Sequence, residues 1–376
     1  MSRHRVSEVE PRSVLVVSQR KVARTPANAT LYEFEDLIGE WESADLYEVD
    51  TYHGNSNFDI RRKVYQGLRL ASSPAQPAIR FANLGARQYQ LDRPYDVAVF
   101  TTSTAFDLFT IGQLVEVRKL AKQVVAYVAE SWPGSTSTKK LCLEPWDLVD
   151  HIFVGVPSAA EELSAILRRV VVPMPAGVDT DLFATQQPDP RPISISNPGR
   201  RAPAQHKLLS RICDEENLWY YYDTISGEMS VPARYHRSSY AETLKHSKAV
   251  VCNPARFDEP ARTRGTQVVP YRVFEALAAG CRIFGSGFTD GSFRNAGLPV
   301  LDIAELPLRP TYEQVHRLLM SGDHEAEPKR YQEIARRHSD WAHRWNAMLA
   351  ELGLRPSPQL AKRLSRLSAD NKMQST

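Results

Sequence analysis

Short apolar runs recur along this chain, and each is bounded by polar residues or by glycine and proline. Runs that are apolar throughout, without alternation, are typical of strands buried on both faces of a parallel sheet. The first half of the chain contains such runs at 13–18, 46–49, 95–100, 124–129, 148–154 and 170–172. The second half contains them at 193–196, 218–222, 249–252, 282–285 and 300–302.

Between these runs, apolar residues recur with the spacing of an amphipathic helix. Over residues 30–42, for example, Leu31, Phe34, Ile38 and Trp41 share one face. The same reasoning predicts helices at 115–122, 159–167, 240–246, 271–279, 311–320 and 331–352. Strands that alternate with helices predict an α/β fold built on parallel sheets.

Length and proline content divide the chain into two domains. A chain of 376 residues exceeds the size at which a single core keeps growing. A proline-rich run at 186–192 falls between the two sets of strands. We therefore expect the following order: a loose tail at 1–12, a first domain at 13–176, a linker at 177–192, a second domain at 193–352 and a basic terminal segment at 353–376.

Charge and cysteine usage narrow the class of protein. The net charge is only +3, so we expect no nucleic-acid partner. The four cysteines are scattered, with neither metal-ligand spacing nor a disulfide pattern. No apolar run approaches the length of a signal peptide core or a membrane span, and we expect a cytoplasmic protein.

The stretch from Asn253 to Gly287 carries the strongest sign of function. It follows a buried strand with a long loop, starts a helix at Pro270 and ends that helix at Gly280. Because open parallel sheets bind ligands at the carboxyl ends of their strands, this loop and the first helical turn lie at a binding edge. The helix start suits a phosphate, and Glu275, about one turn further in, is placed to accept hydrogen bonds from ribose hydroxyls. The stretch is therefore predicted to bind a nucleotide.

The segment VVPYRVFEALAAGC at 268–281, together with GVDTDLF at 177–183, resembles the nucleotide-sugar half of GT-B glycosyltransferases, closest to family 4 and the related "group 1" families. The resemblance implies two facing Rossmann-like domains with a C-terminal helical segment, a donor on the second domain and an acceptor on the first. It also implies retention of anomeric configuration. Glu275 matches the second glutamate of the E-x7-E motif of the family, which holds the donor ribose. The place of the first glutamate is taken by Gln267, and Glu259 could supply the missing carboxylate to the donor sugar.

A glycine and two arginines follow the first strand of the second domain. Glycine lets a backbone approach a ligand, and arginine can neutralise a diphosphate. In the resemblance, Gly199 and Arg200 match a Gly-Arg pair that contacts the donor diphosphate, and Lys207 stands for its lysine partner, one position later than usual. The alternative is an arginine pair on the surface.

Glu130 follows the predicted strand at 124–129 and is the candidate catalytic residue of the first domain. A carboxylate at this edge could stabilise a developing oxocarbenium ion or take the proton of the acceptor hydroxyl. The alternative is a glutamate that caps the next turn.

Two further patterns bear on cofactors. Asp179 and Asp181 form a D-x-D, but they fall in the segment between the domains, and we interpret them as turn caps. We expect no metal and no cofactor beyond the donor substrate. The loop at 19–26 has no glycine, which argues against a dinucleotide-binding dehydrogenase. This basic loop either contacts an anion or is solvated.

The segment 358–368 is basic and amphipathic. It suits either weak attachment to a membrane surface or packing on the protein itself. The sequence as a whole predicts a metal-independent glycosyltransferase that moves a sugar from a nucleotide-sugar donor to an acceptor. The alternatives are a sugar-nucleotide epimerase on the same fold and a non-catalytic subunit that binds a sugar nucleotide. Nothing in the sequence fixes the acceptor or the oligomeric state.

Overall fold

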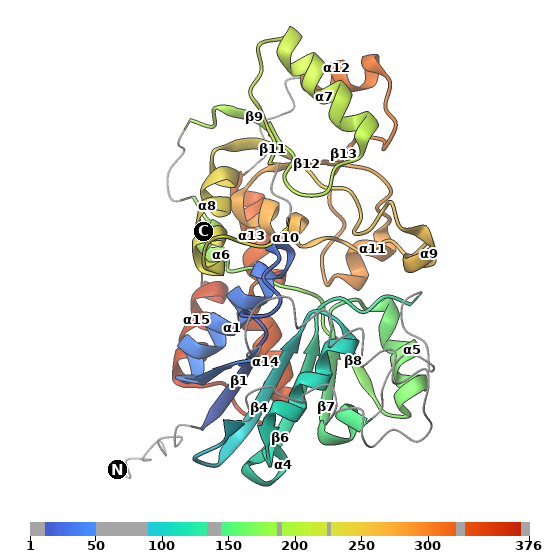
Figure 1. Cartoon of the computed structure of the whole chain (residues 1–376). Helices are drawn as coiled ribbons and strands as arrows, with labels where there is room; N and C mark the ends of the chain where they lie inside the picture. The colour runs from blue at the N-terminus through green and yellow to red at the C-terminus, as the bar shows by residue number, and fades with distance from the viewer. Residues whose placement is uncertain are drawn as a thin grey trace, which may run out of the picture.

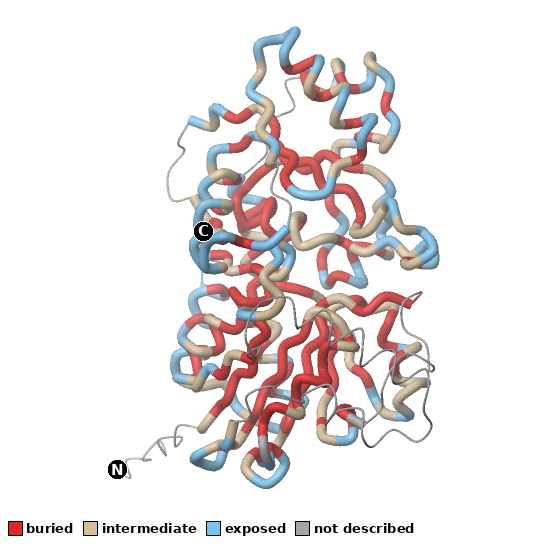
Figure 2. Tube along the Cα trace, in the orientation of Figure 1, coloured by how far each residue is buried: buried red, intermediate tan, exposed pale blue. Residues whose placement is uncertain are grey.

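The computed structural model describes residues 12–49, 89–133, 144–185, 190–223, 227–320 and 328–369. Within them the chain forms two parallel β-sheets, one in each half of an elongated molecule (Figure 1). The central strands of both sheets are buried along most of their length (Figure 2). The predicted α/β fold of two sheets with flanking helices is therefore confirmed.

The first sheet has six strands in the order β2-β1-β4-β6-β7-β8, and every pair is parallel. The strands are β1 (Val14–Ser18), β2 (Asp45–Glu48), β4 (Tyr95–Thr102), β6 (Ala121–Val128), β7 (His151–Val154) and β8 (Val171–Pro173). A separate pair joins β3 (Tyr89–Gln90) to β5 (Leu114–Val115). The strand order reverses between β1 and β4, and open parallel sheets usually bind ligands at the carboxyl ends of strands near such a reversal.

The second sheet has five parallel strands in the order β10-β9-β11-β12-β13. They are β9 (Ile193–Ser196), β10 (Tyr220–Tyr221), β11 (Ser247–Val251), β12 (Arg282–Gly285) and β13 (Ala304–Glu305). Here the order reverses between β9 and β11. The loops at the carboxyl ends of these two strands contain the residues that were predicted from the sequence to bind the donor.

Helices cover the faces of both sheets. The α-helices before the C-terminal segment are α1 (Ala29–Glu42), α4 (Val117–Leu120), α5 (Ser158–Leu167), α6 (Thr180–Phe183), α7 (Pro203–Glu215), α8 (Ala233–Lys245), α9 (Pro260–Thr263), α10 (Tyr271–Ala279), α11 (Asp290–Asn295) and α12 (Tyr312–Met320). Short 3-10 helices are η1 (Pro26–Asn28), η2 (Ala105–Gln113) and η3 (Glu144–Leu148). Helix α10 is buried along Val273–Ala279 because its apolar residues face the second sheet and its neighbouring helices.

The last three helices return the chain to the first domain. They are α13 (Pro328–His338), α14 (Trp341–Glu351) and α15 (Pro358–Ala369). Helix α13 packs on α10, whereas α14 and α15 pack on α1 (Figure 1). Leu360 and Leu367 of α15 are buried in the core cluster, so the apolar face of this basic helix is covered by the protein itself.

Three local predictions were wrong. Residues 115–122 do not form one helix, because Ala121 pairs with Tyr95 and starts strand β6. The predicted helix at 331–352 is two helices, because Asp340 caps α14 with a hydrogen bond from the Ala342 N–H (2.9 Å). The last strand lies at Ala304–Glu305 and not at 300–302. Helix α7 was not predicted at all, although it starts at a proline and buries Leu209 and Ile212 at helical spacing.

Candidate functional site

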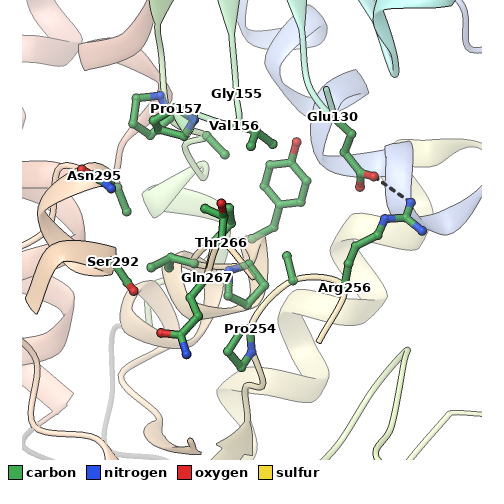
Figure 3. Close-up of a pocket in the computed structure, with 18 of the residues that line it drawn as sticks. Glu130, Gly155, Val156, Pro157, Pro254, Arg256, Thr266, Gln267, Ser292 and Asn295 are labelled. Carbon is green, nitrogen blue, oxygen red and sulfur yellow. Dashed lines mark hydrogen bonds and ion pairs between the residues drawn. The ribbon is translucent and has the colours of Figure 1, made fainter. Parts of the chain in front are cut away.

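A cavity with a volume of about 230 Å³ lies between the carboxyl ends of the two sheets. The first domain supplies 129–130 and Trp132 after β6 and the segment 155–158 after β7. The second domain supplies 253–257 after β11 and 266–272 at the start of α10 (Figure 3). Because strand ends from both sheets meet here, this is the place where the fold can assemble a binding site from distant parts of the chain.

Glu130 lies on the cavity wall, as the sequence predicted for a residue that follows β6. Its backbone N–H donates to the Ser103 carbonyl (2.7 Å), which fixes the main chain. Its carboxylate accepts a hydrogen bond from Arg256 Nη2 at 2.8 Å, so an ion pair joins the two domains beside the cavity (Figure 3). The catalytic role of Glu130 stays a prediction.

Arginines converge on Glu259, beside the cavity. Its carboxylate accepts from Arg200 (2.7 Å), Arg256 (2.8 Å) and Arg262 (3.3 Å). Burial alone would raise the pKa of Glu259, but the hydrogen bonds from Arg200 and Arg256 outweigh it and lower the pKa to about 2. Arg200 lines the cavity and is also paired with Asp258. Both Arg200 and Arg256 are therefore already neutralised by carboxylates.

Gly199 has a positive φ of 71° and lies against the side chain of Arg272. A Cβ at this position would be 2.7 Å from Arg272 Nη2, so the missing side chain makes room for that guanidinium. The Gly199 N–H donates to Asp223 Oδ1 (2.8 Å), which holds the loop after β9. The structure thus brings Gly199 and Arg200 to the cavity edge.

Lys207 is not brought to the cavity with them. It is exposed on α7 and is absent from the cavity wall. The inward position of this helix is occupied by Gln205, which is buried and donates through Nε2 to the carbonyls of Leu306 and Pro307 (2.8 Å each). The diphosphate contact expected of Lys207 stays a prediction without support from the geometry.

Gln267 lies on an uncharged polar part of the wall. Thr266 lies next to it, and α11 contributes Ser292 and Asn295 (Figure 3). Hydroxyl and amide groups can both donate and accept hydrogen bonds, which suits the hydroxyls of a sugar. The structure therefore places Gln267 on the cavity wall, and its contact with a donor sugar stays a prediction.

Glu275 faces the protein interior. It forms an ion pair with Arg237, and Thr30 Oγ1 lies 3.3 Å from its Oε1. Arg237 Nε also donates to Glu33 Oε2 at 2.8 Å, so one buried guanidinium joins two buried glutamates. Helices α1, α8 and α10 supply these residues, and Glu275 is not on the cavity wall. Its contact with a ribose stays a prediction, and in this structure its carboxylate is occupied by Arg237.

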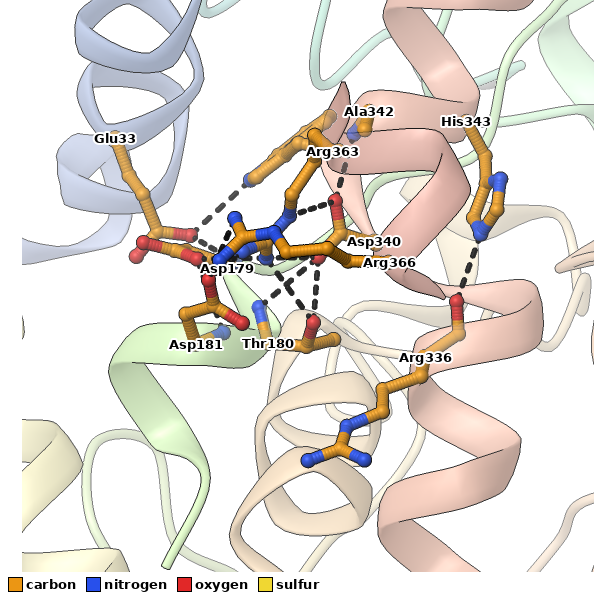
Figure 4. Close-up of polar contacts among 11 residues, drawn as sticks. Glu33, Asp179, Thr180, Asp181, Arg336, Asp340, Ala342, His343, Arg363 and Arg366 are labelled. Atoms are coloured by element: carbon orange, nitrogen blue, oxygen red, sulfur yellow. Dashed lines mark hydrogen bonds and ion pairs between the residues drawn. The ribbon is translucent and has the colours of Figure 1, made fainter. Parts of the chain in front are cut away.

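Of the two D-x-D aspartates, Asp179 forms a helix cap, and both form ion pairs that the sequence did not predict (Figure 4). Asp179 Oδ1 accepts from the Asp181 N–H (3.1 Å) and so caps α6. Arg363 of α15 pairs with Asp179 (3.1 Å), with Asp181 and with the fully buried Asp340. Among the residues that the structure describes, no group of three His, Cys, Asp or Glu side chains could hold a metal ion.

Sequence reasoning missed the roles of Arg237, Arg256 and Arg272. Arg256 lies in the arginine-rich loop that precedes α10, and that composition was its only signal in the sequence. Arg237 lies on α8 and Arg272 on α10, and their contacts depend on how these helices pack.

No protein-family model and no curated protein matches this sequence. Solved structures do match its fold. The N-terminal domain of trehalose-6-phosphate phosphatase from Candida albicans superposes with a TM-score of 0.56 at 10% identity, over 92% of this chain and 97% of that one. An alpha-glucosyltransferase in complex with UDP and a 13-mer DNA gives a TM-score of 0.55 at 11% identity, over 91% and 99%. An alpha-glucosyltransferase in complex with UDP-glucose and DNA containing an abasic site gives a TM-score of 0.52 at 11% identity, over 90% of this chain and 98% of that one.

These likenesses span both domains of the chain, and they confirm the predicted GT-B architecture. At such low identity they show the fold alone. In the described part of the chain, no helix is both long and apolar enough to cross a bilayer.

Proposed function

We propose that this chain is a glycosyltransferase that takes its sugar from a nucleotide-sugar donor bound in the cavity between the two sheets. One observation carries the proposal: Glu130 of the first domain is paired with Arg256 of the second on the wall of that cavity, at the carboxyl ends of both parallel sheets of a GT-B fold. Crevices at this edge are the usual ligand sites of open α/β sheets.

The donor diphosphate is proposed to lie beside Arg200, at the start of α10, where the helix dipole favours negative charge. The donor sugar then faces the hydroxyl and amide groups at Thr266, Gln267 and Ser292. The acceptor enters from the first domain. This arrangement needs no metal ion, because arginines and backbone amides meet the charge of the leaving diphosphate.

Glu130 is the proposed catalytic residue. The acceptor oxygen forms a bond to the anomeric carbon while the bond from that carbon to the diphosphate breaks. Glu130 stabilises the positive charge that develops on the sugar, or takes the proton that the acceptor hydroxyl loses. Retention of configuration is proposed from the family resemblance.

The test is a thermal-shift panel of UDP, GDP, dTDP and ADP sugars, followed by measurement of nucleoside diphosphate release from the best ligand. One donor class should raise the Tm, and the protein should hydrolyse that donor slowly without an acceptor. Glu130→Gln should bind the same donor and release nucleoside diphosphate about a hundredfold more slowly. The proposal is wrong if no nucleotide sugar shifts the Tm.

Two observations favour a second candidate, a non-catalytic subunit that binds a sugar nucleotide. Gln267 stands where the family has a glutamate, and Glu275 is paired with Arg237. Such a subunit would show the same thermal shift but no turnover, whereas an epimerase would change the sugar of the donor without an acceptor.

A further inference from the structure

Three described arginines line the cavity, and they differ in how their charge is balanced. Arg200 is paired with Asp258 and Glu259, and Arg256 with Glu130 and Glu259. Arg272 has no ion pair with any residue that the structure describes. Its guanidinium donates from Nη1 to the Val251 carbonyl at 3.0 Å, which holds it in place without neutralising it.

The position of Arg272 makes this charge costly in the free protein. It lies in the first turn of α10, where the helix dipole is positive and disfavours a second positive charge. The residue is half-buried, so water screens the charge only in part. An anion in the cavity would stabilise the Arg272 charge against both the positive helix dipole and the incomplete screening by water.

Gly199 links Arg272 to the loop that carries Arg200. The guanidinium of Arg272 fills the space that a side chain at residue 199 would occupy. The loop that carries Arg200 therefore also leaves room for the guanidinium of Arg272, and both arginines line the same cavity. Lys207 is exposed on α7 and supplies no charge there.

We propose that Arg272 is the second cationic contact to the donor diphosphate and takes the place of the lysine that Lys207 does not supply. The inference rests on the proposed function for the identity of the ligand. For the anion site itself, it rests on the unbalanced charge of Arg272 and on the room that Gly199 leaves for it.

The test is calorimetric titration of inorganic pyrophosphate, and of the nucleoside diphosphate and nucleoside of the best donor, into wild type, Arg272→Gln and Lys207→Gln. The two variants lose the same charge, one in the cavity and one outside it. Arg272→Gln should weaken both diphosphate ligands about tenfold or more, because it removes charge-assisted hydrogen bonds. Nucleoside binding should not change, and Lys207→Gln should match wild type for every ligand.

Arg272→Lys keeps the positive charge and should retain most of the affinity for pyrophosphate. It is the control that separates loss of charge from misfolding in Arg272→Gln. Equal affinities of wild type and Arg272→Gln, or an equal loss in Lys207→Gln, would overturn the inference. Pyrophosphate binding that depends on Arg272, with no nucleotide sugar bound, would support the anion site and reject the proposed function. If wild type turns over a donor and Arg272→Gln binds diphosphate as tightly as wild type, the proposed function is supported and the anion site at Arg272 is rejected.

Discussion

At the scale of single residues, the charge of the cavity depends on how carboxylates are shared among arginines. Glu259 accepts hydrogen bonds from Arg200, Arg256 and Arg262, and Glu130 accepts one from Arg256. The sequence predicted that Glu130, Arg200 and Gln267 would lie at the carboxyl ends of the sheets. Each of these residues follows a predicted strand or directly precedes α10. Which arginine would pair with which carboxylate could not be predicted, because the pairing depends on the path of the loop between β11 and α10.

Glu259→Gln should strengthen the binding of a nucleoside diphosphate severalfold. The pKa of Glu259 is lowered to about 2, so its charge is present throughout the range from about pH 5 to 8 and repels a diphosphate at Arg200. The charge of Glu259 is therefore constant over that range, so any pH dependence of the gain in calorimetric titrations comes from protonation of the ligand phosphate. If Glu259 also holds the donor sugar, the matching nucleotide sugar should gain less than the diphosphate. Weaker diphosphate binding by the variant would show that Glu259 does not compete for Arg200.

At the scale of elements, buried ion pairs join helices from both domains. Arg237 of α8 links Glu33 of α1 to Glu275 of α10. Arg363 of α15 links Asp179 to Asp340 (Figure 4). The sequence predicted α1, α10 and the C-terminal helices from their apolar spacing. It could not predict that Glu275 would face Arg237, because a helix residue on the border of the apolar face can pair with a neighbouring helix or with a ligand.

Arg237→Met should lower the free energy of unfolding by about 3–5 kcal/mol, because it leaves two buried glutamates without a counter-charge. Urea unfolding measures the change. A triple variant, Glu33→Gln with Arg237→Met and Glu275→Gln, should recover much of the loss, since it buries no net charge. Equal stability of wild type and Arg237→Met would mean that the pair is open to solvent.

At the scale of the whole molecule, the carboxyl ends of the two sheets meet at the cavity described above, and the C-terminal helices return to pack on the first domain. Apolar periodicity predicted an α/β fold on parallel sheets, and chain length with the proline-rich run predicted two domains. That the two domains face each other came only from the family resemblance. The cavity wall from α11 was not predicted, because Ser292 and Asn295 carry no local sign of ligand binding.

Activity should survive an excess of EDTA. The arginines around the cavity offer the positive charge that a metal would otherwise supply to a leaving diphosphate. Donor turnover with and without the chelator measures this directly. Complete loss of turnover that Mg²⁺ or Mn²⁺ restores would contradict a metal-independent reaction.

The most direct test of the account is whether a nucleotide sugar occupies the cavity between the sheets. Asn295 and Arg294 are neighbouring exposed residues of α11, and only Asn295 lines the cavity. Tryptophan at either position leaves the core untouched, but at 295 it projects into the cavity. Calorimetric titration of the best nucleotide sugar should give equal affinities for wild type and Arg294→Trp, and at least tenfold weaker binding for Asn295→Trp and for Thr266→Trp, which also changes the cavity wall. Undiminished binding by both cavity variants would place the donor elsewhere and contradict the account.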